Sequence, residues 1–425
     1  MIFKLNERNI IVIALAVWFT VSGLYLLNTP QGHRNHDFGG HLEYTEIIHN
    51  KHHLPLPYEG WQTYQPPLYY LIINYLAPSI QDDKVKHVDF VRWLSVIYGA
   101  LTICFIWWVL KEMDIKPFAK LISLLFISTI PKFVMVFSTY NNDSLVICLS
   151  VAMFVLSYKL YKNWSKPIAY TLLIVTVGAL YAKYSAILSL GVLIAILLVD
   201  LVQLKIPSPN KTRIVLILAI AALTFIPWIV FHNHHHTNKI FPTNAEHGLG
   251  GFLAVNDDRS VWKGILRIPF LEQDPHEWDD PWAHGYSKPE TKKHDYWAFS
   301  FLTSIYGEVV YNTPGIYFFW SLICIHLLSI VIALKFMLKT PITKLAGAVI
   351  ILGHLSQIAL ILYSESPAAC TMDYRYICWI WLAWSVLYAD VMSAHTRSSQ
   401  ILVKLLSIGF LVQVFVVLTM TGNTS

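Results

Sequence analysis

The sequence has few charged residues for its length. Only 13% of its 425 residues are Asp, Glu, Lys or Arg, whereas 55% are hydrophobic and the mean hydropathy is +0.50. Soluble domains carry about 25% charged residues, so this scarcity predicts a polytopic membrane protein. The formal net charge is only +5, and the lysines lie between apolar runs instead of forming one basic patch. This distribution argues against nucleic acid as a partner.

Cysteine is also scarce. The chain has five, and three of them lie inside apolar runs, where a free thiol behaves as a small hydrophobic group. Only Cys370 and Cys378 fall near one loop. No disulfide framework is therefore expected.

Long apolar runs, in contrast, are abundant, and each can span roughly 30 Å of hydrocarbon. We place them near residues 10–27, 92–110, 119–138, 143–161, 167–181, 185–203, 213–231, 315–336, 345–363, 375–391 and 400–419. Residues 167–203 must form a hairpin, because one helix of that length would reach about 55 Å. No small-residue cleavage site follows the first run, which predicts a retained helix. The expected fold is all-α and polytopic, with about 11 transmembrane helices.

Lysine and arginine are concentrated in alternate short loops, which predicts a cytoplasmic N-terminus and an outer C-terminus. On the other side, the short loops contain only Lys183 and Arg375. With this topology two long segments, about 28–91 and 232–314, lie on the outer face. Leu68–Leu76 is apolar but too short to span and is expected to be a juxtamembrane helix. We see no repeat and no separate soluble domain, so residues 1–425 are expected to form one transmembrane domain.

The first long segment contains the most promising chemistry. Asp37 and His41 are four residues apart and would share one face of a helix. A carboxylate beside an imidazole can take a proton from a hydroxyl nucleophile or help to hold a metal. The alternative is a solvated loop acid with a histidine nearby.

Short motifs in a consistent order surround and follow this pair. They are D-x-x-x-H-x-x-Y from Asp37, Gln65-Pro-Pro-Leu-Tyr-Tyr70, Arg92-Trp-Leu-Ser95, Asn142-Asp143, Ala182-Lys-Tyr184 and Asp373-Tyr-Arg-Tyr376. In this order the sequence resembles the GT-C glycosyltransferase superfamily. More narrowly, it is similar to bacterial relatives of the protein O-mannosyltransferases and to the lipid A aminoarabinose transferase. The likeness covers most of the chain, although each motif is short.

The resemblance implies an inverting transfer of a sugar from a polyprenyl-phosphate carrier to an acceptor hydroxyl, at the periplasmic face of a bacterial inner membrane. The acceptor would be a lipid, a glycan or a protein, and membrane lipids surround the protein. Three sets of residues follow from it: Asp37, His41 and Asp143 as catalytic residues; Lys183, Arg375 and Arg92 on the donor phosphate; and Tyr44, Gln65, Tyr69 and Tyr374 on substrate. No metal ligand is assigned, and the resemblance leaves the requirement for a divalent metal open.

One position departs from the family pattern. Many relatives have a second acid directly after the first, and here Phe38 stands there. Asp143 or Glu43 are candidates for a second carboxylate.

Other charged residues have structural explanations beside the functional ones. Lys183 and Arg375 suit phosphate binding as a point charge and a bidentate donor, and the alternative for both is extension to bulk lipid headgroups. The alternative for Asn142-Asp143 is a helix cap. Lys132, after Pro131, is an intramembrane charge and so a candidate functional residue.

Two polar segments are expected to be less important. His232–His236 lacks the spaced pattern of a dedicated metal site. The acidic stretch from Glu272 to Asp280 contains tryptophan, which can stack on carbohydrate, but an ordinary solvated face is the preferred interpretation.

The main alternative function is a multi-pass transporter or lipid flippase. Transporters place ionisable residues near the bilayer midplane and have paired halves. Here the ionisable residues cluster at one face. A noncatalytic membrane subunit predicts no cluster of acid, histidine and cations, whereas a lipid-linked polymer ligase would use a similar donor.

Overall fold

The structure is a computed structural model, and it describes residues 6–31, 37–77, 83–199, 208–242, 296–305, 313–337, 339–363, 373–394 and 396–420. Within these ranges every regular element is a helix, as the sequence predicts. The helices are α1 (Glu7–Asn28), α2 (Phe38–Lys51), α3 (Leu68–Leu76), α4 (Lys84–Lys111), α5 (Pro117–Ser128), α6 (Pro131–Val136), α7 (Asp143–Lys162), α8 (Lys166–Ala182), α9 (Ala186–Val199), α10 (Ser208–Pro227), a π-helical turn η2 (Trp228–His234), α11 (His235–Thr237), α15 (Tyr296–Ile305), α16 (Thr313–Leu334), α17 (Pro341–Tyr363), a 3₁₀ helix η7 (Tyr374–Ile380), α19 (Trp381–Ser393) and α20 (Arg397–Met420).

Most of these helices are apolar enough to lie in a membrane. Among the described residues, seven helices have the length and hydropathy to cross a bilayer, and four shorter apolar helices accompany them. The chain is therefore an integral, multi-pass membrane protein. Each of the eleven predicted spans coincides with an apolar helix, and the number that cross completely stays a prediction.

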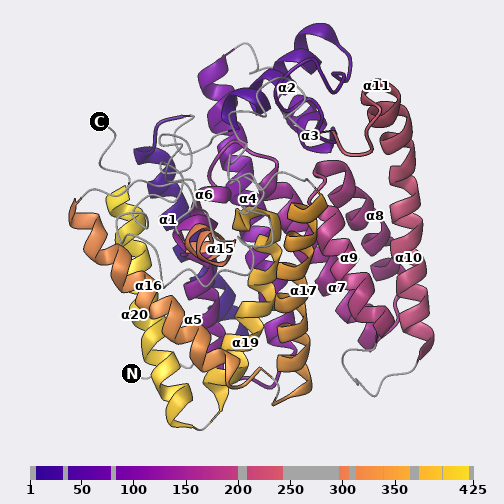
Figure 1. Ribbon diagram of the computed structural model, residues 1–425. Helices are drawn as coiled ribbons and strands as arrows, with labels where there is room; N and C mark the ends of the chain where they lie inside the picture. Colours follow the sequence, from indigo (N-terminus) through magenta and orange to yellow (C-terminus); the bar gives the residue numbers. More distant parts are fainter. Residues whose placement is uncertain are drawn as a thin grey trace.

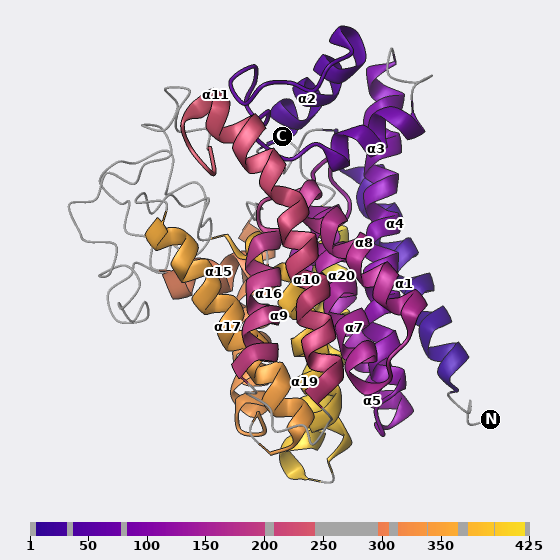
Figure 2. The same cartoon turned by 90° about the vertical axis from the view of Figure 1, so that its right-hand side faces the viewer.

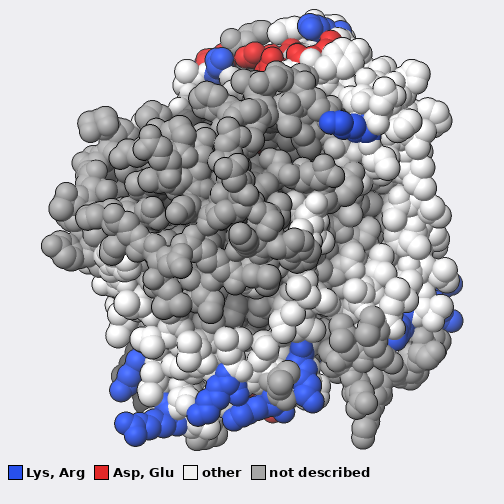
Figure 3. Space-filling view, in the orientation of Figure 1, with Lys and Arg blue, Asp and Glu red and all other residues white. Residues whose placement is uncertain are grey.

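The long helices run side by side as a bundle, and α2 and α3 lie together at one end of it (Figure 1). In the view turned by 90°, α10 lies in front of α8 and α9, and α1, α4 and α5 lie along the right-hand side of the bundle (Figure 2). On the face seen in Figure 3, most lysines and arginines gather at the end opposite α2, and most acidic residues lie at the α2 end. We call these the lysine-rich end and the α2 end.

The third predicted span is wrong as a continuous helix. Residues 119–138 are divided into α5 and α6, because Ile130, the residue before Pro131, has an extended ψ of 127°. A proline restricts the residue before it and lacks the N–H that a continuing helix needs. The break turns α6 into a short buried helix and places Lys132 in its first turn.

Two other local predictions are confirmed. The hairpin at Tyr181–Tyr184 exists, since α8 ends at Ala182 and α9 begins at Ala186. The juxtamembrane segment is a helix with the predicted bounds, Leu68–Leu76. The first long loop is shorter than predicted, because α4 begins at Lys84, where Asp83 caps it by accepting a hydrogen bond from the Lys86 amide.

Candidate functional site

Six charged side chains pair with one another around the α2 end. Asp37 accepts from Arg375 at 3.0 Å, Asp143 accepts from Lys183 at 2.7 Å, and Asp373 lies 3.0 Å from the Lys132 Nζ. These pairs, which we call the ion-pair cluster, join positions as much as 338 residues apart. The sequence predicted four of the six as site residues, namely Asp37, Asp143, Lys183 and Arg375.

The three pairs differ in how far they are buried. The side chains of Asp37 and Arg375 keep 15% and 11% of their surface exposed, and those of Asp143 and Lys183 keep 4% and 5%. The Lys132–Asp373 pair is closed off, with 1% and 0%. The Asp37–Arg375 pair is therefore the most exposed of the three, and the Lys132–Asp373 pair is the most deeply buried.

Helix ends position most of these charges. Asp37 stands at the N-cap of α2, Asp143 is the first residue of α7, and Asp373 caps η7, so all three acids face helix N-termini. Lys183 stands at the C-cap of α8. Each of these four charges has the sign that complements its helix dipole, which is worth about 0.3–1 kcal/mol apiece at exposed sites. The sequence folds this way locally because the polar residues interrupt the apolar runs.

The cluster perturbs the protonation of its members that lie outside the spans. Burial would raise the pKa of Asp37, but the charges of Arg375 and Lys183 and the hydrogen bond from Trp61 outweigh it and hold that pKa well below its ordinary value. Burial lowers the pKa of Lys183, against the opposing effect of Asp143. Asp37 is therefore ionised, and it is a weak base as long as Arg375 stays paired with it.

His41 is a neutral imidazole at physiological pH. Burial lowers its pKa to about 4, although Asp37 acts in the opposite direction. Its Nδ1 lies 2.8 Å from the Tyr70 hydroxyl, while its buried Nε2 has no hydrogen-bond partner among the described residues. The side-chain amide of Asn142, also buried, has none there either. Because unpartnered buried polar atoms are costly, both groups point to a ligand or water at the cluster.

Three half-buried aromatic side chains adjoin the cluster. The Trp61 indole donates to Asp37 at 3.4 Å, and the Tyr376 ring centroid lies 5.7 Å from the Lys183 Nζ and 5.5 Å from the Arg375 guanidinium. Burial raises the pKa of Tyr64 well above its ordinary value, and the charges of Tyr376 and Asp37 raise it further. The sequence analysis did not single these residues out as site residues.

The position of Trp61 depends on two neighbours. Glu43 accepts a hydrogen bond from the Trp61 amide at 2.9 Å, so this acid holds the loop and Asp143 is the second carboxylate of the cluster. Gly40 allows the close approach, because a Cβ there would lie 2.7 Å from the Trp61 ring. Phe38, at the position of the missing acid, packs edge-on against Tyr140 at 5.9 Å.

The four predicted substrate residues are all buried, each at most 5% exposed. Tyr44 stacks on Tyr70 at 3.7 Å and donates to the Gln65 carbonyl, and this stack fastens α2 to α3. Tyr69 packs edge-on against Tyr140, and Tyr374 packs on Trp381. These contacts support the site from behind, and a role in substrate binding stays a prediction.

Arg92 does not join the cluster. Its guanidinium donates to the backbone carbonyls of Ser138 and Thr29, at 3.3 and 3.0 Å, and lies 3.5 Å from Asp89. These contacts tie the end of α1 to the segment after α6. Binding of a phosphate by Arg92 stays a prediction.

The part of the chain that the structure describes contains no ready set of metal ligands. Within the described ranges no three or more His, Cys, Asp and Glu side chains are grouped so as to hold an ion. Asp37 and Asp143 each face a cation instead. His232 stacks on Trp228 at 3.7 Å and bonds to the Pro55 carbonyl, which explains that residue structurally. The acidic stretch Glu272–Asp280 lies outside the described residues.

Two members of the cluster were missed or undervalued. Lys132 was noted as an intramembrane charge, but its partner Asp373 was seen only as part of a motif. The available signal was a lone lysine in an apolar run, which requires a buried acid elsewhere in the chain. Several acids lie next to predicted spans on that side, among them Asp89, Glu365 and Asp373, so the sequence does not single out Asp373 as the partner.

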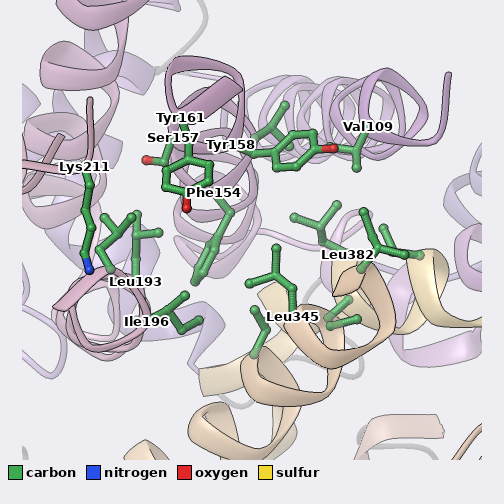
Figure 4. Close-up of a pocket in the computed structure, with 17 residues that line it drawn as sticks. Val109, Phe154, Ser157, Tyr158, Tyr161, Leu193, Ile196, Lys211, Leu345 and Leu382 are labelled. Carbon is green, nitrogen blue, oxygen red and sulfur yellow. The ribbon is translucent and has the colours of Figure 1, made fainter. Parts of the chain in front are cut away.

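A separate apolar cavity lies toward the lysine-rich end. It has a volume of about 110 Å³ and lies between α7, α9, α17 and α19. Phe154, Leu193, Leu345 and Leu382 point toward the same space (Figure 4). Its lining comes mainly from the second halves of α7 and α9 and the first turns of α17 and α19, and Lys211 of α10 also lines it.

Comparisons with known proteins identify the fold. No protein-family model matches the chain, and no curated protein matches it. Solved structures do match. The apo oligosaccharyltransferase of Archaeoglobus fulgidus aligns with a TM-score of 0.55 and 12% identity, over 99% of this chain and 56% of that one. The same organism's oligosaccharyltransferase AglB, in complex with an inhibitory peptide and a dolichol-phosphate, aligns with a TM-score of 0.51, 12% identity and the same coverage.

The fold is of the GT-C type. This confirms the fold class that the motifs predicted. The chain spans little more than half the length of the oligosaccharyltransferase that it matches, and at 12% identity the likeness concerns the fold alone.

Proposed function

We propose that this protein is a membrane glycosyltransferase that moves a sugar from a polyprenyl-phosphate carrier to an acceptor hydroxyl. The observation that supports this most is the ion-pair cluster, in which a partly exposed carboxylate, Asp37, faces two cations at one end of a GT-C fold. The dolichol-phosphate bound to AglB agrees with a lipid-phosphate donor. We place the reaction at the outer face of a bacterial inner membrane.

In the proposed reaction the acceptor hydroxyl oxygen attacks C1 of the sugar. The bond between C1 and the phosphate oxygen breaks, and its electron pair leaves with polyprenyl phosphate, so that the configuration at C1 inverts. The hydroxyl proton goes to Asp37. Arg375 and Lys183 stabilise the charge that grows on the departing phosphate, and they do so more strongly in the transition state than in the ground state.

Binding of the donor would also activate the base. Without donor, Arg375 is paired with Asp37 and Lys183 with Asp143, and the six charges of the cluster sum to zero. A donor phosphate between Arg375 and Lys183 exchanges these carboxylates for its own oxygens. Since Arg375 opposes burial in setting the pKa of Asp37, its departure raises that pKa and makes Asp37 a better base.

Neighbouring groups complete the proposed site. The unpartnered Nε2 of His41 accepts a hydrogen bond from the acceptor hydroxyl and orients it toward Asp37. Trp61, Tyr64 and Tyr376 offer half-buried ring faces beside the reacting charges, and aromatic faces pack well against sugar rings. Their closeness to the cluster would limit the access of water and therefore hydrolysis of the donor.

An assay of the purified protein in lipid vesicles, with radiolabelled polyprenyl-phosphate sugars, tests this function. We expect transfer or slow donor hydrolysis by the wild type, and a loss of about 10²–10⁴-fold in Asp37→Asn, as for removal of a general base. The matched control is Glu46→Gln, a change of an exposed acid on the same helix. Full activity in Asp37→Asn contradicts the assignment. Uptake into vesicles without transfer favours a transporter instead.

A further inference from the structure

Lys132 and Asp373 form the deepest pair of the cluster, and the proposed reaction does not use them. The Lys132 Nζ lies 3.0 and 3.1 Å from the two Asp373 carboxylate oxygens. Both side chains are closed off from solvent. Burying two charges costs several kcal/mol per ion, and an apolar pair of similar size often gives equal or better stability. A buried pair of this kind therefore calls for an explanation beyond stability.

Asp373 contacts the residue that faces Asp37. Its Oδ1 accepts a hydrogen bond from the Arg375 amide at 2.8 Å, and its Oδ2 lies 4.0 Å from the Arg375 Nε. Its carbonyl accepts from the Gln357 side chain at 2.8 Å, and the next amide donates to Thr303. The turn that carries Arg375 is thus fastened to α6, α15 and α17, and Asp373 is its centre.

The Asp373 carboxylate has two opposing effects on the turn that carries Arg375, and Lys132 cancels one of them. The Asp373 carboxylate is needed as a cap for η7, but its charge also attracts the Arg375 guanidinium away from Asp37. In a buried site such an attraction is weakly screened. Lys132, within 3.1 Å of both carboxylate oxygens, neutralises Asp373 and leaves the guanidinium paired with Asp37.

We propose that Lys132 is a positioning residue, which neutralises Asp373 so that Arg375 stays available to the donor phosphate. This inference rests on the proposed function, because it assigns Arg375 to that phosphate. It adds Lys132 and Asp373 to the proposed site, as a pair that does not contact substrate but positions Arg375.

The test measures the dissociation constant of polyprenyl phosphate, without any sugar, for three variants in lipid nanodiscs. Lys132→Met should weaken binding about tenfold, or about 1.4 kcal/mol, because the bare Asp373 charge then competes for Arg375. Lys132→Met/Asp373→Asn should recover most of this loss, because asparagine keeps an oxygen for the cap but carries no charge. Lys120→Met is the matched control, since Lys120 is equally buried and pairs with Glu7 at 2.7 Å far from the site.

Recovery in the double variant follows from positioning, but removal of an unpaired buried charge would also restore stability. The unfolding temperature of each variant is therefore measured beside its affinity. An affinity that merely follows the folded fraction of each variant overturns the proposal. Wild-type binding in Lys132→Met overturns it as well. Absence of binding by the wild type instead contradicts the proposed function, and with it this inference.

A structure of Lys132→Met without donor provides a check that needs no ligand. We expect the Arg375 guanidinium to move from Asp37 toward Asp373. An unchanged Arg375–Asp37 contact contradicts the inference even if the protein transfers no sugar.

Discussion

The ion-pair cluster and the apolar cavity are built from the same parts of the chain. Asp143 opens α7 at the cluster, whereas Phe154, Tyr158 and Tyr161 further along that helix line the cavity. Asp373 and Arg375 likewise begin the segment whose continuation, α19, contributes Leu382. Two elements therefore change from charged to apolar along their length.

The difference between the two regions follows from the side chains that each presents. The cluster lies at helix ends, which have unsatisfied backbone groups and a partial charge and can hold ions. The cavity is lined mainly by apolar side chains, and Lys211 is the one charged residue among the described residues that line it. Binding of an ionic headgroup is therefore expected at the cluster, while the cavity suits apolar groups.

The largest expected effect is that one substitution at the cluster raises the affinity for polyprenyl phosphate and lowers the transfer activity. Asp37→Asn should bind polyprenyl phosphate about tenfold more tightly, or by about 1.4 kcal/mol, because Arg375 no longer has a carboxylate partner to leave. The same variant should lose its transfer activity. Equilibrium binding in nanodiscs measures the first effect, and the transfer assay measures the second.

Glu46→Gln, on the same helix, should change neither quantity. Weaker binding by Asp37→Asn contradicts the proposal that the donor phosphate replaces Asp37 as the partner of Arg375. It would indicate that Asp37 itself contributes to holding the phosphate.

A second effect concerns acid stability. His41 has a folded pKa of about 4, below its ordinary value of 6.5, so the folded state binds fewer protons than the unfolded state between these values. Stability should therefore be full above about pH 6.5 and fall by a few kcal/mol as the pH drops to about 4. Asp37, which faces His41, titrates below this window, since its pKa in the folded state lies well below 3.8.

Thermal unfolding in detergent at several pH values measures this loss. His41→Asn keeps a nitrogen or oxygen near Tyr70 but does not titrate. The unfolding temperature of this variant should therefore change less than that of the wild type between about pH 6.5 and pH 4. The matched control is His53→Asn, at an exposed histidine that pairs with Glu59. Equal slopes for His41→Asn and the wild type contradict the prediction.

The smallest effect is expected in the cavity. Ala346→Leu places a larger side chain in the apolar space and should stabilise the fold by about 1 kcal/mol, as cavity-filling changes commonly do. The affinity for polyprenyl phosphate should stay the same. A marked loss of affinity would show that the isoprenoid chain occupies the cavity and that the two regions act as one site.

Much of the fold could be predicted from the sequence because hydrophobicity is a local property. The apolar runs located the helices, and the polar Tyr181–Tyr184 placed the hairpin. The break at Pro131 was not predicted, since an apolar run on both sides of a proline resembles one span. The exact start of α4 also differed, because its first turn is polar and lies beyond the apolar run.

The site could be predicted in part. Asp37, Asp143, Lys183 and Arg375 stood out because polar residues next to lipid are rare and their motifs resemble a known superfamily. Their pairing did not follow from the sequence, because it joins helix ends far apart in the chain. The buried positions of Tyr44 and Tyr69 were not evident either, since a loop of aromatic residues can face substrate or pack on itself.

The sequence by itself determined that this protein is helical, lies in a membrane and has charged residues where the apolar runs end. These properties depend on hydropathy and on residues close together in the chain. Only the tertiary structure decided which acid neutralises which cation, and that Lys132 and Asp373 stand behind Arg375. The physical reason is that a Coulombic interaction depends on distance in space and on burial, and packing of the helices sets both.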